Sequence, residues 1–283
     1  MSSHLFIRLG KNILDLSFRP HVVGIVNVTP DSFSDGNRYL NPDQCLKHIE
    51  RLIEEGADII DLGAESTRPG ALPISEKEEI ARLQPVLKKY TQYFDIPLSI
   101  DTTKSAIADL SLSLGASIIN DISGFQKDPL MPKVIAKYQA AVVIMHSQGT
   151  PQIMQNNPQY SNIMDEVKLY FQKAIAIART EGIQSVIIDP GIGFGKTASH
   201  NLVLLNRIDH FAQLGCPMMI GVSRKSVIGH VSNASVEDRL PGTIAANVAA
   251  FLKGACLFRV HDVEQNVQAL QVAKAIRDGG IAT

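Results

Sequence analysis

Cysteine is scarce in this sequence, and the few cysteines present follow no known spacing motif. Cys45, Cys216 and Cys256 are an odd, scattered trio without a CxxC pair. Scattered cysteines of this kind commonly serve as small apolar side chains in a reducing cytosol. The sequence therefore predicts no disulfide framework. Neither an HxxxH pair nor a cysteine cluster is present, which removes the usual argument for a structural or catalytic zinc.

Long runs of one charge or of apolar residues are also missing. The net charge is -1 and there is no basic run, which argues against nucleic acid as the main partner. The longest uncharged apolar stretch, near residues 240–252, is too short and too interrupted to span a bilayer. Residues 1–4 lack the charged and apolar regions of a signal peptide. We therefore expect a cytoplasmic globular protein, whose 45% hydrophobic residues suffice for one large domain or two small ones.

The sequence does contain a module that repeats from residue 22 onward. An apolar strand ends in polar residues, a loop and an amphipathic helix follow, and the next strand begins. Eight strands are predicted, at residues 22–28, 58–63, 97–101, 117–121, 141–146, 185–189, 217–223 and 255–260.

Helix start and stop signals separate these strands. Asn41-Pro42 begins a helix that runs to Gly56, with proline near the first helical position and glycine at the end. Ser75 and Glu78 resemble a capping box for the next helix. Further helices are predicted at about residues 104–114, 128–138, 161–181, 199–214, 235–253 and 262–278.

Residues 5–16 precede the repeated modules and resemble a small hairpin that turns at residues 10–12. Eight strand–helix units without a linker are typical of an α/β protein of the (β/α)₈ TIM-barrel class. A doubly wound sheet would normally have fewer strands or a second domain. The sequence therefore predicts one TIM-barrel domain over residues 1–283, with a short N-terminal β-hairpin.

Polar residues follow nearly every predicted strand. In a barrel these positions surround one mouth, which is where barrel enzymes place their active sites. Capping of the next helix explains single members, and it explains Asp262 and Ser75 better than function does. His146 is equally well explained as a satisfied residue at a strand end. As a whole the set favours function: Asn27, Glu65, Ser66, Thr67, Arg68, Asp101, Asn120, Asp121, His146, Asp189, Ser223, Arg224, Lys225, Arg259, His261 and Asp262.

The segment from Asp189 to Lys196 places an acid, a proline and three alternate glycines at the end of a buried strand. Glycine at this density indicates positive φ angles and close approach to a ligand. A Walker phosphate loop does not fit, because Pro190 stands where its first glycine is required. A dinucleotide fingerprint fits only loosely, because the acid near the expected distance, Asp209, lies in a helical pattern. The ligand of this loop must therefore be inferred from the other polar residues around the barrel mouth, which we call the polar ring.

The ring has two chemical characters. Carboxylates and an amide suit the edge of a flat nitrogen heterocycle, because a carboxylate accepts two parallel N–H bonds. Cationic side chains suit an anion such as diphosphate. The first group is Asp101, Asn120 and Asp189, and the second is Arg68, Lys225, Arg259 and His261. Asn27 together with a diphosphate would suit Mg²⁺, which prefers oxygen ligands. No Ser-His-Asp or Cys-His set favours covalent catalysis.

Seven motifs together resemble the dihydropteroate synthase family. Residues 27–36 (NVTPDSFSDG) and 61–70 (DLGAESTRPG) are similar to its two signatures. The resemblance continues in order through residues 99–102, 119–122, 189–196, 223–226 and 259–262. It covers nearly the whole chain from residue 22 onward, and the combination is very specific even though a single motif such as DPG would be weak.

The resemblance implies an enzyme of folate synthesis. It would join (7,8-dihydropterin-6-yl)methyl diphosphate to 4-aminobenzoate, giving 7,8-dihydropteroate and diphosphate. The mechanism would be SN1-like, with diphosphate leaving before the amine traps a pterin methyl cation. The resemblance also implies Mg²⁺, a homodimer, and sulfonamides as inhibitors. Because Ser66-Thr67-Arg68-Pro69 is intact, we expect ordinary sulfonamide sensitivity.

Site roles follow from the resemblance, position by position. Asp101, Asp189, Lys225 and Arg259 would be catalytic. The pterin would contact Asp101, Asn120, Met145, Asp189, Phe194, Lys225 and Arg259. The diphosphate would contact Asn27, Arg68, Arg259 and His261, with Asn27 on Mg²⁺. The 4-aminobenzoate would contact Thr67, Pro69 and Ser226.

Two other functions are compatible with parts of the pattern. A methyltetrahydrofolate-type methyltransferase pterin domain shares the pterin-binding acids but needs neither the Asn27 loop nor a diphosphate site. A non-catalytic pterin-binding barrel would need no metal ligand and no cationic set. The formation of dihydropteroate from the two substrates separates all three.

Overall fold

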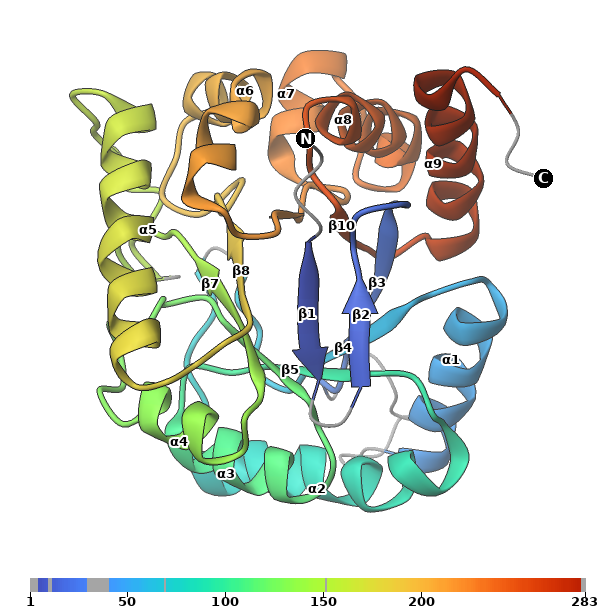
Figure 1. Cartoon of the computed structure of the whole chain (residues 1–283), viewed down its shortest axis with the longest axis vertical. Helices are drawn as coiled ribbons and strands as arrows, with labels where there is room; N and C mark the ends of the chain where they lie inside the picture. The colour runs from blue at the N-terminus through green and yellow to red at the C-terminus, as the bar shows by residue number, and fades with distance from the viewer. Residues whose placement is uncertain (1–4, 10–11, 30–40, 69, 151, 281–283) are drawn as a thin grey trace.

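The computed structural model describes residues 5–9, 12–29, 41–68, 70–150 and 152–280, and it contains a barrel of parallel strands surrounded by helices (Figure 1). Neighbouring strands pair in the order β8-β7-β6-β5-β4-β3-β10-β9. Their bounds are β3 His21–Asn27, β4 Ile59–Gly63, β5 Leu98–Asp101, β6 Ile118–Asp121, β7 Ala141–Met145, β8 Val186–Asp189, β9 Met219–Ile220 and β10 Leu257–Val260. The predicted eight-stranded barrel is confirmed.

The barrel closes between β8 and β9 through few interactions. Ile188 and Met218 form an isolated parallel bridge. The Ile188 amide donates to the carbonyl of Pro217 at 2.9 Å. By comparison, β3 and β4 are paired over five residues of each strand. The closure is therefore the part of the barrel wall with the least strand pairing.

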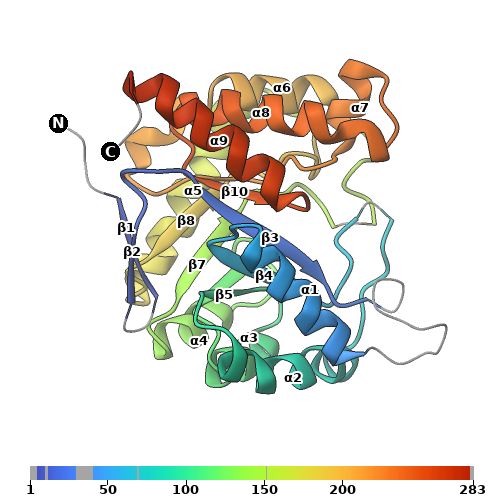
Figure 2. The same ribbon diagram turned by 90° about the vertical axis from the view of Figure 1, so that its right-hand side faces the viewer.

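Helices connect successive strands and cover the outside of the barrel (Figure 2). Their bounds are α1 Pro42–Glu54, α2 Glu76–Tyr93, α3 Ser105–Ser113, α4 Met131–Lys137, α5 Ile163–Thr180, α6 Ala198–Asn206, α7 Ser226–Ser232, α8 Leu240–Leu252 and α9 Val263–Asp278. Proline in the first turn of α1 and a Ser75 side chain that accepts from Glu78 N confirm the two predicted helix starts. None of the described helices is both long and apolar enough to cross a membrane.

Three helical segments differ from the prediction. Residues 199–214 divide into α6 and a 3₁₀ helix, Ile208–Leu214, while residues 235–253 divide into the 3₁₀ helix Glu237–Arg239 and α8. Helix α7 was not predicted, because Gly229 weakens its helical pattern. A Cβ at Gly229 would lie 2.5 Å from Arg239 Nη2, so the glycine allows close packing that a sequence pattern does not reveal.

The predicted N-terminal hairpin is confirmed. Strands β1 (Phe6–Leu9) and β2 (Asn12–Asp15) pair antiparallel, and the predicted turn residues 10 and 11 lie outside the described residues. The hairpin lies at the end of the barrel opposite to the end where β3 finishes (Figure 2). Its buried Ile7 and Leu9, with the following Leu16, join a hydrophobic cluster with strand residues. The hairpin therefore plugs the N-terminal end of the barrel.

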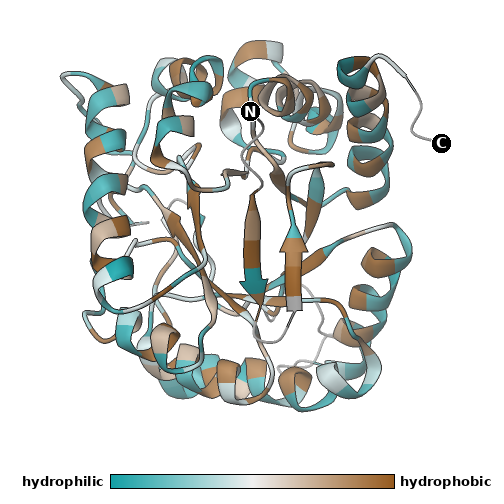
Figure 3. Ribbon diagram, in the orientation of Figure 1, coloured by the Kyte–Doolittle hydropathy of each residue, from teal (hydrophilic) through white to brown (hydrophobic). Residues whose placement is uncertain are grey.

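A second and larger hydrophobic cluster lies between the strands and the surrounding helices. Ile60 and Leu62 of β4 belong to this cluster, as do Leu52 of α1 and Leu83 of α2. Apolar residues are concentrated on the strands and on the helix faces that cover them (Figure 3). Because side chains alternate along a strand, the intervening residues of β4 point into the barrel. One of these residues is an acid, Asp61, which has only 1% of its surface exposed.

Candidate active site

The inward-facing positions of the barrel strands change from apolar to polar toward the C-terminal end. On β4 the inward residues are Ile59 and then Asp61, and on β10 they are Leu257 and then Arg259. Other strands repeat the change: Ile118 to Asn120 on β6, and Ile187 to Asp189 on β8. Alternation with a period of two thus brings these polar side chains into one layer inside the barrel mouth.

Strand register aligns several predicted residues within this layer. Asn27 is paired with Gly63 of the next strand, and Gly63 is paired with Asp101. Asp101 is in turn paired with Asn120. A Cβ at Gly63 would lie 3.3 Å from Asp101 Cβ, so the glycine leaves room for this carboxylate. On the other side of the barrel, Met145 of β7 is paired with Asp189 of β8.

Arg259 joins two buried carboxylates at the centre of the layer. Its Nε donates to Asp61 Oδ2 at 2.6 Å, and its Nη2 donates to Asp101 Oδ2 at 3.0 Å. Burial raises the pKa of Asp101 to about 7, while the positive charge of Arg259 opposes this rise. Burial alone would lower the pKa of Arg259, but Asp61 and Asp101 outweigh it and raise that pKa. The guanidinium therefore stays charged and stabilises carboxylates that would otherwise be costly to bury.

Asn120 carries a buried acceptor to which none of the described residues donates. Its Nδ2 donates to Asp61 Oδ2 at 3.2 Å. Its Oδ1 is buried and has no hydrogen-bond partner within the described part of the chain. A buried acceptor without a partner is costly, so this oxygen is suited to an N–H group of a ligand.

Asp189 and Lys225 both lie close to Gly221, and the missing side chain of this glycine leaves space beside them. A Cβ on Gly221 would lie 3.6 Å from Asp189 Oδ2 and 3.8 Å from Lys225 Nζ. Burial raises the pKa of Asp189, and the charge of Lys225 opposes the rise. Burial likewise lowers the pKa of Lys225 to about 8, opposed by the charge of Asp189. A flat ligand over Gly221 would meet a carboxylate and an ammonium group at once.

The loop after β8 is held by its own backbone groups rather than shaped as a phosphate cradle. Gly191, Gly193 and Gly195 have φ angles of 65°, 85° and 64°, which explains the three glycines. A Cβ at Gly191 would lie 2.0 Å from the His146 carbonyl oxygen, so this loop packs closely on the loop after β7. The amide of Gly191 donates to Asp189 Oδ1 at 2.7 Å, and that of Gly193 donates to Asn201 Oδ1 at 2.8 Å.

Lys196 fixes the same loop from inside. Its Nζ donates to the carbonyl oxygens of His146, Gly191 and Phe194 at 3.1, 3.0 and 2.9 Å. Its side chain is buried, so it is not available to an external phosphate. The loop instead presents Phe194 to Lys225, whose Nζ lies 4.5 Å from the centre of the ring. Lys225 Nζ also donates to the Ile192 carbonyl at 2.5 Å.

The predicted anion-binding residues lie around the other side of the mouth. His261 Nδ1 is 3.0 Å from Ser223 Oγ. Burial lowers the pKa of His261 to about 4, and the charges of Arg259 and, more weakly, Arg68 add to this effect. His261 is therefore neutral at pH 7 and would act there through hydrogen bonds. Arg68 itself is exposed, and Asn27 is half-buried at the end of β3.

The residues predicted for 4-aminobenzoate are divided between two segments. Thr67 is half-buried beside Arg68, and Ser226 is exposed as the first residue of α7. Pro69 lies outside the described residues, as do residues 30–36 of the first motif.

Asp262 has a different role from the predicted one. Its side chain makes no capping bond to α9 within the described structure. Its carboxylate accepts from Nε and Nη2 of Arg224, a residue with a φ of 56°. Arg224 was counted with the ring, but this ion pair holds it beside the start of α9. The capping prediction was wrong because the partner of Asp262 is 38 positions away in the sequence.

His146 is buried at the end of its strand, and its Nδ1 has no hydrogen-bond partner among the described residues, so the prediction of a satisfied residue is wrong for that atom. Its ring packs edge-on against Tyr170 with centroids 4.8 Å apart. Burial lowers the pKa of the His146 ring to about 2, so the ring is neutral. Its carbonyl oxygen accepts from Lys196. The edge-on packing and the bond from Lys196 support a structural role for His146 at the strand end.

The sequence prediction did not single out Asp61, although this residue contacts two residues that the prediction did assign. Besides Arg259 and Asn120, its carboxylate accepts from Ser99 Oγ at 2.6 Å. A signal was present: an acid inside the apolar strand Ile59–Gly63 is costly unless it is paired.

Comparison with known proteins extends over nearly the whole chain. Residues 23–261 match the family described as Pterin binding enzyme. The dihydropteroate synthase of Clostridium beijerinckii is 43% identical over 273 residues, which are 95% of this chain and 99% of that protein. The dihydropteroate synthase of Escherichia coli is 44% identical over 264 residues, 93% of each protein.

Solved structures give the same result. A Yersinia pestis dihydropteroate synthase with a sulfonamide drug complex has a TM-score of 0.91 at 42% identity, covering 97% of this chain and 100% of that one. A Xanthomonas albilineans dihydropteroate synthase with 4-aminobenzoic acid has a TM-score of 0.90 at 38% identity, covering 97% and 99%. The similarity therefore includes the barrel, its mouth and the strands that carry Asp101, Asp189 and Arg259.

Proposed function

Because the chain belongs to the pterin binding enzyme family, and within it to the dihydropteroate synthases, we propose that Asp101, Asn120 and Asp189 bind the pterin of its substrate. The enzyme joins (7,8-dihydropterin-6-yl)methyl diphosphate to 4-aminobenzoate in folate biosynthesis. The strongest support for the pterin site is the unpartnered buried Oδ1 of Asn120 beside two buried carboxylates. The N–H groups of a pterin supply the donors that these three acceptors need.

In this proposal the two faces of the pterin contact apolar and cationic side chains. Met145 is buried beside Asp189, and Phe194 lies under the Lys225 ammonium. Lys225 donates to a ring acceptor, and Arg259 stacks on the ring or reaches beyond it. Arg259 already bonds to Asp61 and Asp101, so its position is set before the substrate binds.

Departure of diphosphate is the step that the cationic groups assist. Arg259, Arg68 and the neutral His261 donate to its oxygens as negative charge develops there. The carboxylates of Asp101 and Asp189 lie on the ring side, where positive charge builds in an SN1-like reaction. Loss of one such preorganised interaction costs about 3 kcal/mol, or roughly a hundredfold in rate.

Asn27 fits the proposed Mg²⁺ as one oxygen ligand among several from the substrate. Among the described residues there is no group of three or more His, Cys, Asp or Glu that could hold a metal. The Asn27 carboxamide lies at the end of β3, and Mg²⁺ commonly takes its remaining ligands from phosphate and water. When bound, the ion would neutralise charge on the leaving diphosphate.

The amine of 4-aminobenzoate attacks from the side of Thr67, Pro69 and Ser226 in the proposed arrangement. An aniline nitrogen is neutral and nucleophilic at pH 7, so the site requires no strong general base. Sulfonamides share the aminophenyl part of this substrate and are proposed to occupy the same place. Growth of a synthase-deficient host carrying this chain in high sulfonamide would contradict the expected sensitivity.

A homodimer is proposed as the working form, in the cytoplasm. Exposed apolar side chains on neighbouring helices α6 and α7, such as Leu202, Val203 and Val231, support an interface on this side. Sedimentation velocity of the purified protein measures this directly, and a monomer at micromolar concentration would reject the dimer.

One assay tests the function itself. The purified protein is incubated with the pterin diphosphate, Mg²⁺ and 4-aminobenzoate, and dihydropteroate is quantified by chromatography. The synthase forms product only when all components are present. Correctly folded protein that forms no product would reject the assignment, and product formed equally well in excess chelator would reject the role of Mg²⁺.

A further inference from the structure

The loop of residues 65–74 lies between β4, which ends at Gly63, and α2, which begins at Glu76. It carries Thr67 and Arg68, which belong to the proposed 4-aminobenzoate and diphosphate sites. Its residues 65–68 and 70–74 are described, and Ala71 N donates to the Arg68 carbonyl at 3.0 Å. The position of these two side chains therefore depends on what holds the two ends of the loop.

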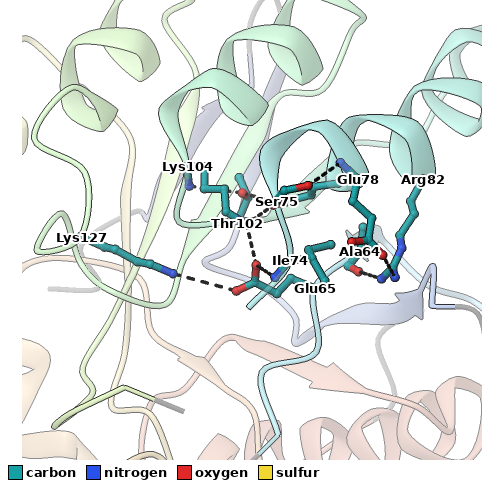
Figure 4. Close-up of polar contacts among 10 residues, drawn as sticks. Ala64, Glu65, Ile74, Ser75, Glu78, Arg82, Thr102, Lys104 and Lys127 are labelled. Atoms are coloured by element: carbon teal, nitrogen blue, oxygen red, sulfur yellow. Dashed lines mark hydrogen bonds and ion pairs between the residues drawn. The ribbon is translucent and has the colours of Figure 1, made fainter. Parts of the chain in front are cut away.

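Glu65 connects the two ends of this loop. Its Oε2 accepts from the backbone amide of Ile74 at 3.2 Å. The first residue of the loop therefore holds its last residue, which lies two positions before Glu76, the first residue of α2. Lys127 approaches the other oxygen, Oε1, at 3.9 Å. Figure 4 shows the Glu65 carboxylate between Ile74 and Lys127. The carboxylate closes the loop across its base.

Lys104 anchors Glu65 to the body of the protein. Its Nζ donates to Glu65 Oε2 and to Glu79 Oε2, each at 2.5 Å. Glu79 on α2 is fully buried and also accepts from Thr102 Oγ1 at 2.7 Å. Burial lowers the pKa of Lys104, but the bonds to Glu65 and Glu79 outweigh this and raise it, so the ammonium stays charged.

A second contact fixes the residue before the loop. Arg82 on α2 donates from Nη1 to the Ala64 carbonyl at 2.7 Å, and from Nη2 to Glu78 at 2.5 Å (Figure 4). Ala64 and Glu65 are thus held by side chains from α2 and from the loop after β5. No substrate role falls to Glu65 or Lys104, although Glu65 belongs to the polar ring at the mouth.

We propose that Glu65, anchored by Lys104, is a positioning residue that holds Thr67 and Arg68 at the 4-aminobenzoate side of the mouth. The inference rests on the proposed function, since it takes the place of 4-aminobenzoate from there. Glu65 and Lys104 act through the loop backbone and touch neither substrate. Their loss would disorder the second substrate site and leave the pterin site, built on β5, β6 and β8, unchanged.

The test compares Glu65→Ala with Glu65→Gln and with Lys137→Met. Glu65→Ala removes the acceptor of the Ile74 amide but leaves the Lys104–Glu79 pair, so the buried Glu79 keeps its partner. Glu65→Gln keeps an oxygen for that amide. Lys137→Met serves as the control. It removes an exposed ion pair that joins Lys137 of α4 to Asp109 of α3.

We expect Glu65→Ala to raise KM for 4-aminobenzoate about tenfold, and Glu65→Gln to restore it to within about threefold of the wild type. Pterin affinity, measured by fluorescence titration, stays within about twofold in all three variants. Amide hydrogen exchange in residues 65–74 becomes faster in Glu65→Ala while β4 is unchanged. Equal loss of both affinities, or no change of either, would overturn the proposal.

Thr67→Ala separates this inference from the function on which it rests. If Thr67→Ala raises KM for 4-aminobenzoate and Glu65→Ala does not, the substrate site stands and the positioning role is rejected. If neither variant changes this KM while the wild type forms dihydropteroate, the positioning role of Glu65 and the assignment of Thr67 are both rejected, and the synthase function stands. Absence of product from the wild type would reject the synthase function before either variant is considered.

Discussion

The two ends of the barrel interior are built by the same strands but stabilised in opposite ways. At the N-terminal end the hairpin inserts Ile7 and Leu9 among apolar strand residues. At the C-terminal end Asp61, Asp101 and Arg259 hold charges inside the barrel. Burial of apolar surface stabilises the first end directly, whereas the charges of the second gain little after desolvation. Stability and function therefore come from different ends of one interior.

The largest expected effect comes from removal of the central cation. Arg259→Met leaves Asp61 and Asp101 without a positive partner, so we expect the free energy of unfolding to fall by about 3–5 kcal/mol. Synthase activity should fall by at least about a thousandfold, because the same guanidinium serves the substrate. Urea unfolding and initial rates measure the two losses.

A double variant distinguishes these losses from each other. Asp61→Asn in the Arg259→Met background removes one unpaired charge, so part of the stability should return while activity stays low. Recovery of activity together with stability would show that Arg259 acts only as a structural partner of the carboxylates. The C-terminal end of the barrel interior would then contribute to stability in the same way as the N-terminal end.

The N-terminal end should respond in the opposite manner. Ile7→Ala removes a fully buried side chain from the hairpin, and the free energy of unfolding should fall by about 2–5 kcal/mol. Both KM values should stay the same, because the hairpin lies far from the mouth. Ile13→Ala on β2, where the side chain is exposed, is the matched control and should change stability by less than about 0.5 kcal/mol. A changed KM in Ile7→Ala would show that the two ends are coupled.

A single carboxylate at the mouth should matter for binding and little for folding. Asp189→Asn should weaken pterin binding about a hundredfold, because it loses charged hydrogen bonds to the ring. Stability should stay equal or rise, since burial makes the charged form of Asp189 unfavourable. Asp58→Asn serves as the control. Asp58 is paired with Arg19 and directly precedes β4, so it lies toward the N-terminal end of the barrel, and its replacement should leave pterin binding unchanged. Unchanged pterin binding in Asp189→Asn would reject the assigned role of Asp189.

The smallest expected effect is a pH dependence that only the charged end can show. Burial raises the pKa of Asp101 to about 7 and lowers that of Lys225 to about 8. Protonated Asp101 cannot accept two N–H bonds, and neutral Lys225 loses its charge. Pterin affinity should therefore decline below about pH 7 and above about pH 8. Asp101→Asn should remove the acid decline only, and an acid decline near pH 4 in the wild type would contradict this assignment.

Much of this arrangement was readable from the sequence because of strand periodicity. Apolar runs that end in Asp101, Asn120 and Asp189 locate strand ends, and in a parallel barrel all strand ends face one mouth. The prediction could therefore bring together residues from strands far apart in the chain. Periodicity also separated the hairpin from the barrel.

Side-chain partners were less readable. The pairing of Asp262 with Arg224 and of Glu65 with Lys104 depends on how loops fold, which no local pattern determines. Helix α7 was missed because Gly229 lowers helix propensity, although the Arg239 side chain packs closely against it. Asp61 was within reach, because an acid in a fully buried strand needs a partner.

The weakly paired closure between β8 and β9 has a consequence for how the enzyme responds to its substrate. Asp189 ends one of these strands, while Gly221 and Lys225 follow the other. A pterin that contacts both Asp189 and Lys225 would cross-link the barrel where its wall has the fewest backbone bonds. Substrate binding would then slow local unzipping along this line and make the protein more resistant to proteases there than elsewhere.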